Sequence, residues 1–188
     1  MTALTDAILA LITVALAGRL FARAAGRRPV LLWAWAFVFM ALAAISGALY
    51  HYGVRAVWKA VPLSSGAAMF CFGCAAAAAW LRPPLRRAAI VLLALQFAGC
   101  IAMTVKSDAF WVAIADAAPV LLALLLGAAM RRGDASSPSI IAGVVLTIVG
   151  AGVQAISALH LGPFNHNDLF HLIQMPAMFL LYRGGRAL

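Results

Sequence analysis

Histidine has the widest chemical scope of the residue types in this sequence, and four histidines stand among its 188 residues: His51, His160, His166 and His171. A neutral imidazole is the commonest metal ligand in proteins and also exchanges protons near neutral pH. A catalytic zinc site typically uses about three protein ligands and leaves one position open for water. His51, His166 and His171 are our candidate metal ligands. The structural alternative is that they bond only to backbone carbonyls or lipid headgroups.

The spacing of His166 and His171 limits how these two residues can share a metal. Residues five apart on an ideal helix are rotated by about 140°, whereas residues four apart lie on one face. The two imidazoles can meet if His166 belongs to the loop before the helix and turns back. We therefore expect this helix to begin near Asn167 or Asp168, with one of them as its N-cap.

Three further polar residues are expected slightly deeper in the membrane than the histidines: Ser46, Gln154 and Gln174. Unpaired polar groups at this depth cost free energy, so these side chains should face one another. Gln154 and Gln174 are interpreted as hydrogen-bond partners between helices. Their contribution to any chemistry, like that of His160, is left open.

A catalytic site also needs residues that transfer protons and residues that stabilise an oxyanion. An ionisable residue inside a membrane helix normally faces the bundle interior, which makes Asp116 a candidate general base. Asp168 is a second candidate, and Ser46 could steady a developing oxyanion. Each has a structural alternative: an ion pair of Asp116 with Lys106, an interaction of Asp168 with a helix N-terminus, and close helix approach at Ser46 beside Gly47.

Long apolar runs form the elements that must position these residues. Hydrophobic residues make up 66% of the chain and charged residues only 10%, against about 25% charged in a typical soluble domain. A helix needs about 20 apolar residues to cross a bilayer. The runs predict an all-α polytopic membrane protein, a seven-transmembrane helix bundle that forms a single domain over residues 1–188. The predicted spans are 5–22, 30–52, 60–80, 86–105, 109–130, 139–160 and 167–183.

Basic residues predict the orientation of these spans. The net charge is +9, but Lys and Arg lie between apolar runs rather than on an amphipathic face, so no nucleic-acid partner is expected. Connections on one side hold eleven arginines, and those on the other hold only Arg55, Lys59 and Lys106. The positive-inside rule then puts the N-terminus outside and the C-terminus in the cytoplasm, in the cell (inner) membrane.

Two segments resemble the CREST superfamily, which includes alkaline ceramidases and progestin/adiponectin-type receptors. They are Ser46–His51 (SGALYH) in the second predicted span and His166–Gly184 (HNDLFHLIQMPAMFLLYRG) in the seventh. The family pairs Ser-x-x-x-His in the second span with His-x-x-x-His opening the seventh, on a seven-helix bundle that holds one zinc ion. The resemblance implies a zinc-dependent hydrolase of lipid amides, with three histidine ligands and a metal-bound water as nucleophile.

The sequence departs from this family pattern at several positions. Alignment on His51 and His171 leaves Gly47 at the serine position and Asn167 at the first histidine, so Ser46 and His166 are each displaced by one residue. The acidic residue near the start of the third span is also missing. In this chain Asp116 or Asp168 would have to replace it.

Two hypotheses of function follow. The first is a zinc-dependent hydrolase of a lipid amide or ester at a histidine-lined pocket near the outer membrane face. The second is a non-catalytic sensor or small-lipid-binding protein that uses the same pocket. Both take membrane lipids or another hydrophobic small molecule as partner, and the sequence does not identify a protein partner. A haem protein is disfavoured because paired haem ligands usually lie deeper in a bundle.

Overall fold

The computed structural model describes residues 1–188 as a bundle of seven α-helices, so the all-α prediction is confirmed. The helices are α1 (Thr2–Ala24), α2 (Arg28–His51), α3 (Ala60–Trp80), α4 (Pro83–Lys106), α5 (Trp111–Met130), α6 (Ser137–Ala155) and α7 (His166–Gly185). A 3₁₀ turn, η1 (Arg55–Val57), precedes α3. Two short antiparallel strands, β1 (His160–Leu161) and β2 (Phe164–Asn165), precede α7.

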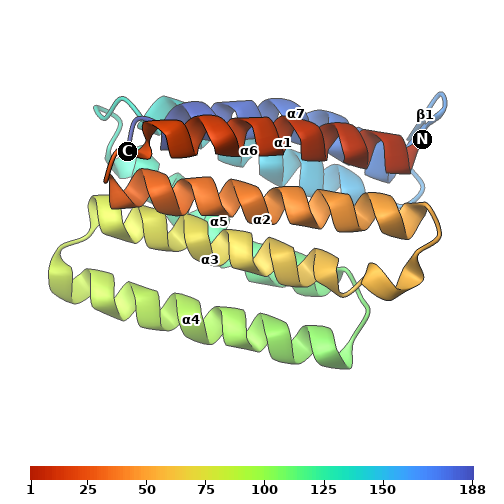
Figure 1. Cartoon of the computed structure of the whole chain (residues 1–188), viewed down its shortest axis with the longest axis horizontal. Coiled ribbons are helices and arrows are strands. Elements are labelled where there is room, and N and C mark those ends of the chain that lie inside the picture. The colour runs from red at the N-terminus through yellow and green to blue at the C-terminus, as the bar shows by residue number, and fades with distance from the viewer.

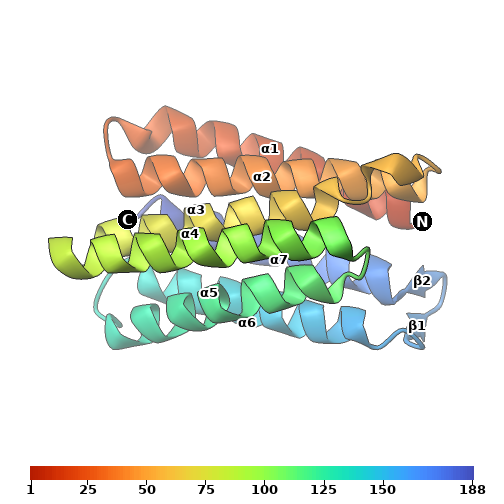
Figure 2. The same cartoon turned by 90° about the horizontal axis from the view of Figure 1, so that it is seen from below.

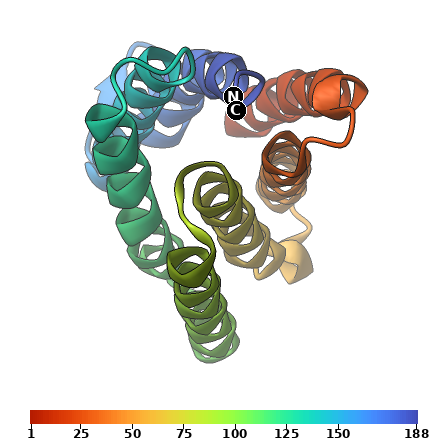
Figure 3. The same cartoon turned by 90° about the vertical axis from the view of Figure 1, so that its left-hand side faces the viewer.

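Six of the helices form a closed ring. In order around it, α1 contacts α2, α2 contacts α3, α3 contacts α5, α5 contacts α6, α6 contacts α7, and α7 returns to α1 (Figure 3). α4 lies outside this ring against α3 and α5 (Figure 2). The first and last helices of the chain are therefore neighbours.

Consecutive helices run in opposite directions, so the connections gather at two ends of the bundle (Figure 1). The histidine end carries His51, His160, His166 and His171. The arginine end, where α1, α3, α5 and α7 finish, carries Arg19, Arg23, Arg27, Arg28, Arg82, Arg86, Arg87, Arg131, Arg132, Arg183 and Arg186.

Six helices are long and apolar enough to cross a membrane: α1 to α6, with η1 counted together with α3. Large hydrophobic side chains such as Leu11, Leu92 and Leu95 are exposed on the outside of the bundle. Monomeric soluble proteins rarely expose extensive apolar surface, so the fold is compatible with a membrane bundle. α7 is also 20 residues long, but its first half carries polar side chains and it is not among the six.

Close contacts fix α7 between its neighbours. A Cβ atom added to Gly143 of α6 would lie 2.8 Å from Cγ of Leu181, so only a residue without a side chain fits there. Small residues at such contacts are typical of membrane helices. Trp33 of α2 is fully buried and donates its Nε1–H to the carbonyl oxygen of Leu181 at 3.0 Å. These contacts hold α7 against both α6 and α2.

The sixth predicted span, 139–160, is too long, because α6 ends at Ala155. The following residues enter a hairpin in which His160 pairs with Asn165 and Leu161 with Phe164. Its two-residue turn begins at Gly162 with φ of +59°, a left-handed conformation suited to such turns, and continues with Pro163. The mostly apolar residues 156–161 extend the hydrophobic run, but the backbone leaves the helix at Ile156, whose φ of −92° and ψ of 81° are not helical.

Candidate functional site

A cavity of about 360 Å³ opens inside the ring at the histidine end. Its walls come from α1, α2, α3, α6 and α7, together with the connections that precede α3 and α5. We call it the Asp6 cavity. Its polar lining consists of Asp6, Tyr50, His51, Ser65, Gln154, His166, Asn167, His171 and Gln174.

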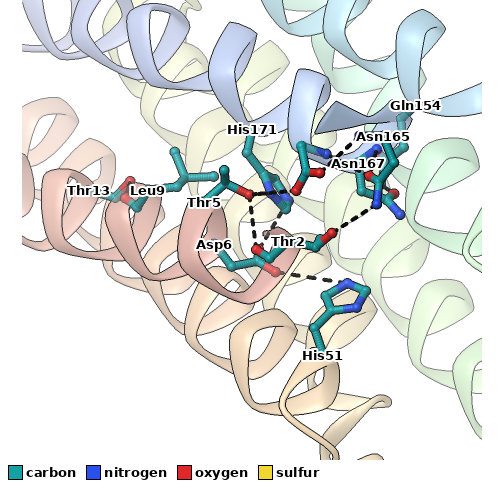
Figure 4. Close-up of polar contacts among 11 residues, drawn as sticks. Thr2, Thr5, Asp6, Leu9, Thr13, His51, Gln154, Asn165, Asn167 and His171 are labelled. Atoms are coloured by element: carbon teal, nitrogen blue, oxygen red, sulfur yellow. Dashed lines mark hydrogen bonds and ion pairs between the residues drawn. The ribbon is translucent and has the colours of Figure 1, made fainter. Parts of the chain in front are cut away.

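Asp6 of α1 lies between two imidazoles in this cavity. Its Oδ1 is 3.1 Å from Nε2 of His171 on α7, and its Oδ2 is 4.0 Å from Nε2 of His51 on α2 (Figure 4). Asp6 is only 4% exposed, whereas the side chain of His51 is 30% exposed. Three helices therefore bring one acid and two imidazoles together, and His51 is the more accessible imidazole.

His171 has a partner at both ring nitrogens. While Nε2 faces Asp6, Nδ1 lies 2.9 Å from Oγ1 of Thr5, one residue earlier on α1. The same hydroxyl lies 3.3 Å from Oδ1 of Asp168. An imidazole bonded on both sides keeps a fixed orientation and tautomer. His171 consequently holds the Asp6 carboxylate in place.

A capping box starts α7 at His166. The side chain of Asn165 accepts the backbone N–H groups of Asn167 at 2.9 Å and Asp168 at 3.0 Å, and Oδ2 of Asp168 accepts the N–H of Asn165 at 3.0 Å. This reciprocal pattern satisfies free N–H groups at a helix start. The N-cap is thus Asn165 and not Asn167 or Asp168 as the spacing suggested. The bonds of Asp168 agree with its structural alternative, while its catalytic role stays a prediction.

Three buried polar atoms at the cavity lack a hydrogen-bond partner: Nδ1 of His166, Oδ2 of Asp6 and Oε1 of Gln174. His166 is the first residue of α7 and lines the cavity together with His51 and His171. The three predicted metal ligands therefore share one cavity. Buried polar atoms are nearly always paired in proteins, so these three mark positions where a bound molecule or ion would be stabilised.

Gly47 explains how α2 comes so close to Asp6. A Cβ atom at this position would lie 3.0 Å from Oδ1 and 3.1 Å from Oδ2 of Asp6. Any side chain here would press on the carboxylate that faces both imidazoles.

An apolar pocket of about 310 Å³ adjoins the Asp6 cavity. α5 and α6 supply most of its wall, including Ile114, Leu121 and Ile148. Gln154 and Gln174 line both spaces: Gln154 donates to Asn167 Oδ1 at 3.2 Å, and Gln174 donates to Thr147 Oγ1 at 3.4 Å. Six residues are common to the two linings: Met40, Ser65, Phe110, Gln154, Phe170 and Gln174. A polar chamber and an apolar chamber therefore share a wall.

Four of the predicted polar residues do not line the Asp6 cavity: Asp116, Asp168, Ser46 and His160. Asp116 faces α4, where its Oδ1 accepts a hydrogen bond from Gln96 Nε2 at 3.3 Å, so Gln96 and not Lys106 is its partner. Ser46 is half-buried on α2 but is absent from the cavity wall. His160 is exposed in β1, and its Nδ1 lies 3.0 Å from the carbonyl oxygen of Ala158.

Asp6 is the site residue that sequence reasoning missed. The rule that an ionisable residue inside an apolar helix faces the bundle interior singled out Asp116, and it applies equally to Asp6. Thr2, Thr5 and Asp6 also follow one another at helical spacing, which predicts a polar face on α1. That signal was present in the sequence, but it does not identify α7 as the helix that the face meets.

Neither a curated protein nor a solved structure matches the chain significantly. One family model matches it over residues 1–188, that of DUF6962, described as a family of unknown function. Since the match covers the whole chain, the protein belongs to the DUF6962 family.

Proposed function

We propose that the protein is a membrane hydrolase that cleaves a lipid amide or ester in the Asp6 cavity. The observation that carries this proposal is the carboxylate of Asp6, buried between His51 and His171 in a polar cavity that shares a wall with an apolar pocket. The polar chamber suits the scissile bond, and the apolar pocket suits an acyl chain.

Asp6 acts as the general base in this proposal, in place of Asp116 or Asp168. Its Oδ2 has no hydrogen-bond partner and can accept a proton from water as the water oxygen attacks the carbonyl carbon. The same proton then passes to the leaving amine or alcohol as the bond to it breaks. His171 positions the carboxylate through its bond to Oδ1.

Zinc enters the proposal through the resemblance to the CREST superfamily. Imidazole nitrogen is a usual zinc donor, and His51, His166 and His171 line one cavity in which Nδ1 of His166 has no partner. In the structure, no three His, Cys, Asp or Glu side chains lie close enough together to form a metal-binding group. The three histidines are the residues that would hold zinc, but His171 could do so only if one of its ring nitrogens left Asp6 or Thr5. The ion would then supply a Lewis acid beside the carbonyl group.

The orientation in the membrane is part of the same proposal. We infer seven spans, with α7 as the seventh, the arginine end in the cytoplasm and the histidine end outside, in the cell (inner) membrane. The excess of eleven arginines over three basic residues supports this orientation. The Asp6 cavity then faces the outer leaflet, from which a lipid would enter.

Hydrolysis and metal content test the proposal together. The detergent-purified protein, prepared without chelator, is given an amide probe, N-lauroyl-4-nitroaniline, and an ester probe, 4-nitrophenyl laurate, and its zinc is measured by elemental mass spectrometry. We expect about one zinc per chain and hydrolysis of at least one probe. Asp6→Asn should lower kcat by about 100-fold or more. His51→Ala and His171→Ala should lose both the zinc and the activity.

His160→Ala is the matched control, because this histidine is exposed and lies outside the cavity. It should retain zinc and activity. A parent protein that hydrolyses neither probe, or equal losses in His160→Ala and His51→Ala, would overturn the hydrolase proposal.

A non-catalytic lipid-binding protein is the second candidate. It is favoured by the two contacts that occupy both nitrogens of His171, since a fully bonded imidazole is suited to a fixed structure. This candidate predicts that the lauroyl probes raise the midpoint of thermal unfolding without release of nitroaniline or nitrophenol. Turnover of either probe by the parent, lost in Asp6→Asn, excludes it.

A further inference from the structure

Four arginines surround a hollow at the arginine end, opposite the Asp6 cavity. It has a volume of about 410 Å³ and lies between the last turns of α1 and α7. We call it the arginine hollow, and its lining consists of Arg19, Arg23, Phe179, Tyr182, Arg183 and Arg186. Arg19 and Arg23 are one turn apart on α1, and Arg183 follows Phe179 by one turn on α7, so each pair lies on one helix face.

The four guanidinium groups have no partner within the chain. None of them donates a hydrogen bond to another group of the protein. The basic partners in the ion pairs of the protein are His51, His171 and Lys59, and none is an arginine. The carbonyl oxygens of Arg23 and Arg186 are instead satisfied by Arg27, whose guanidinium donates to them at 2.8 Å and 3.4 Å. The side chains that face the hollow are therefore free to bind another molecule.

The protein supplies almost no negative charge at this end. The chain has five acidic residues, all aspartates, and only Asp134, in the connection between α5 and α6, belongs to the arginine end. Asp134 does not line the hollow. Four like charges around one hollow repel one another, and a bound anion would remove that repulsion.

We propose that the arginine hollow binds the phosphate group of an anionic phospholipid. The planar guanidinium fork matches phosphate oxygens in a bidentate geometry, and basic pockets between membrane helices bind anionic lipid headgroups. A free phosphate ion would satisfy the same chemistry. Phe179 favours the lipid, because it is 49% exposed beside the arginines, one helical turn toward the bilayer interior, where an acyl chain would contact it.

Lipid retention measured by native mass spectrometry tests this inference. The protein is reconstituted in vesicles of phosphatidylglycerol and phosphatidylcholine in equal amounts, extracted in mild detergent, and its bound lipids are counted. We expect selective retention of phosphatidylglycerol. Arg19→Gln combined with Arg183→Gln should reduce it about tenfold, whereas the same two positions changed to lysine should give a smaller loss, because charge is kept and the fork is not.

Arg87→Gln combined with Arg132→Gln is the matched control, since it removes two charges from the same end but outside the hollow. It should change retention less than twofold. Equal losses in the two glutamine variants, or no preference for phosphatidylglycerol in the parent, would overturn the proposal. If millimolar inorganic phosphate displaces the lipid completely, the site is one for free phosphate and the lipid assignment is wrong. The lysine variant keeps the test valid if the glutamine variant does not fold.

Discussion

At the histidine end, one carboxylate serves two imidazoles, because Oδ1 of Asp6 faces His171 and Oδ2 faces His51. Asp6 is buried, so its partners cannot be replaced easily by bulk water. Small changes in the position of this side chain should therefore affect both histidines at once. Gly47 on α2 lies beside this carboxylate and has no side chain to displace it.

Replacement of Gly47 by alanine tests this dependence. The new Cβ atom would lie 3.0 Å from Oδ1 of Asp6, so the carboxylate must shift away from residue 47, which disturbs its 3.1 Å contact with His171. We expect the free energy of unfolding to fall by about 1–3 kcal/mol, as for other overpacked sites, together with a loss of hydrolysis. The measurements are thermal unfolding in detergent and turnover of the lauroyl probes.

Gly18→Ala is the control for this change, because nothing lies within 4 Å of a Cβ atom at Gly18, also a glycine within a membrane helix. It should leave activity unchanged and stability equal or slightly higher, since alanine favours a helix more than glycine does. The interpretation of Gly47 fails if both alanine variants behave alike.

At the scale of elements, the first turn of α7 determines where His166 and His171 lie. Asn165 and Asp168 form its capping box, and Asp168 also accepts a hydrogen bond from Thr5 of α1. The amide of Asn165 donates to the hydroxyl of Thr2 at 3.1 Å. The cap therefore joins α7 to α1 in addition to starting the helix.

Asn165→Ala should lower the free energy of unfolding by about 1 kcal/mol, because two backbone N–H groups at the start of α7 lose their acceptor. Hydrolysis should fall as well, since the first turn of α7 carries His166. Thermal unfolding and probe turnover measure the two effects. Ser157→Ala, an exposed change in the connection before β1, is expected to alter neither. Unchanged stability in Asn165→Ala would contradict the assigned role of the cap.

The helices could be predicted from the sequence because each is a continuous apolar run separated from the next by charged residues, glycine or proline. The end of α6 could not, because the mostly apolar residues 156–161 continue the run although the backbone leaves the helix at Ile156. The sequence predicts that Asp116 lies within an apolar helix, but the direction in which its side chain points depends on its hydrogen bond with Gln96 of α4. The pair of Asp6 with His171 depends on contact between α1 and α7, which no local spacing specifies.

At the scale of the whole molecule, the two ends differ in chemistry. One end carries eleven arginines and a single aspartate, and the other carries four histidines, three of which line a cavity with a buried carboxylate. A bilayer with anionic lipids on the cytoplasmic side would align such a molecule in one direction. The proposed orientation follows from this asymmetry and can be tested without knowledge of the activity.

Single cysteines report this orientation, and the three native ones provide a low background because all are buried. A membrane-impermeant maleimide should label Ser157→Cys in intact cells, since residue 157 lies in the connection at the histidine end. It should label Ala135→Cys, between α5 and α6, only after permeabilisation. The reverse pattern would invert the proposed topology, and labelling of both positions from one side would contradict the assignment of α6, the helix between them, as a membrane span.

The contact between α1 and α7 also determines the order of steps as the protein is synthesised and assembled. Thr5 and His171 are 166 residues apart in the sequence, so α7 leaves the ribosome roughly 10–30 s after α1 at ordinary rates of synthesis. During that interval Asp6 lies within an apolar helix, and its partner His171 has not yet been synthesised. α1 is thus inserted before the free-energy cost of its carboxylate is offset. It becomes fully stable in the bundle only when α7, the last helix to be synthesised, packs against it.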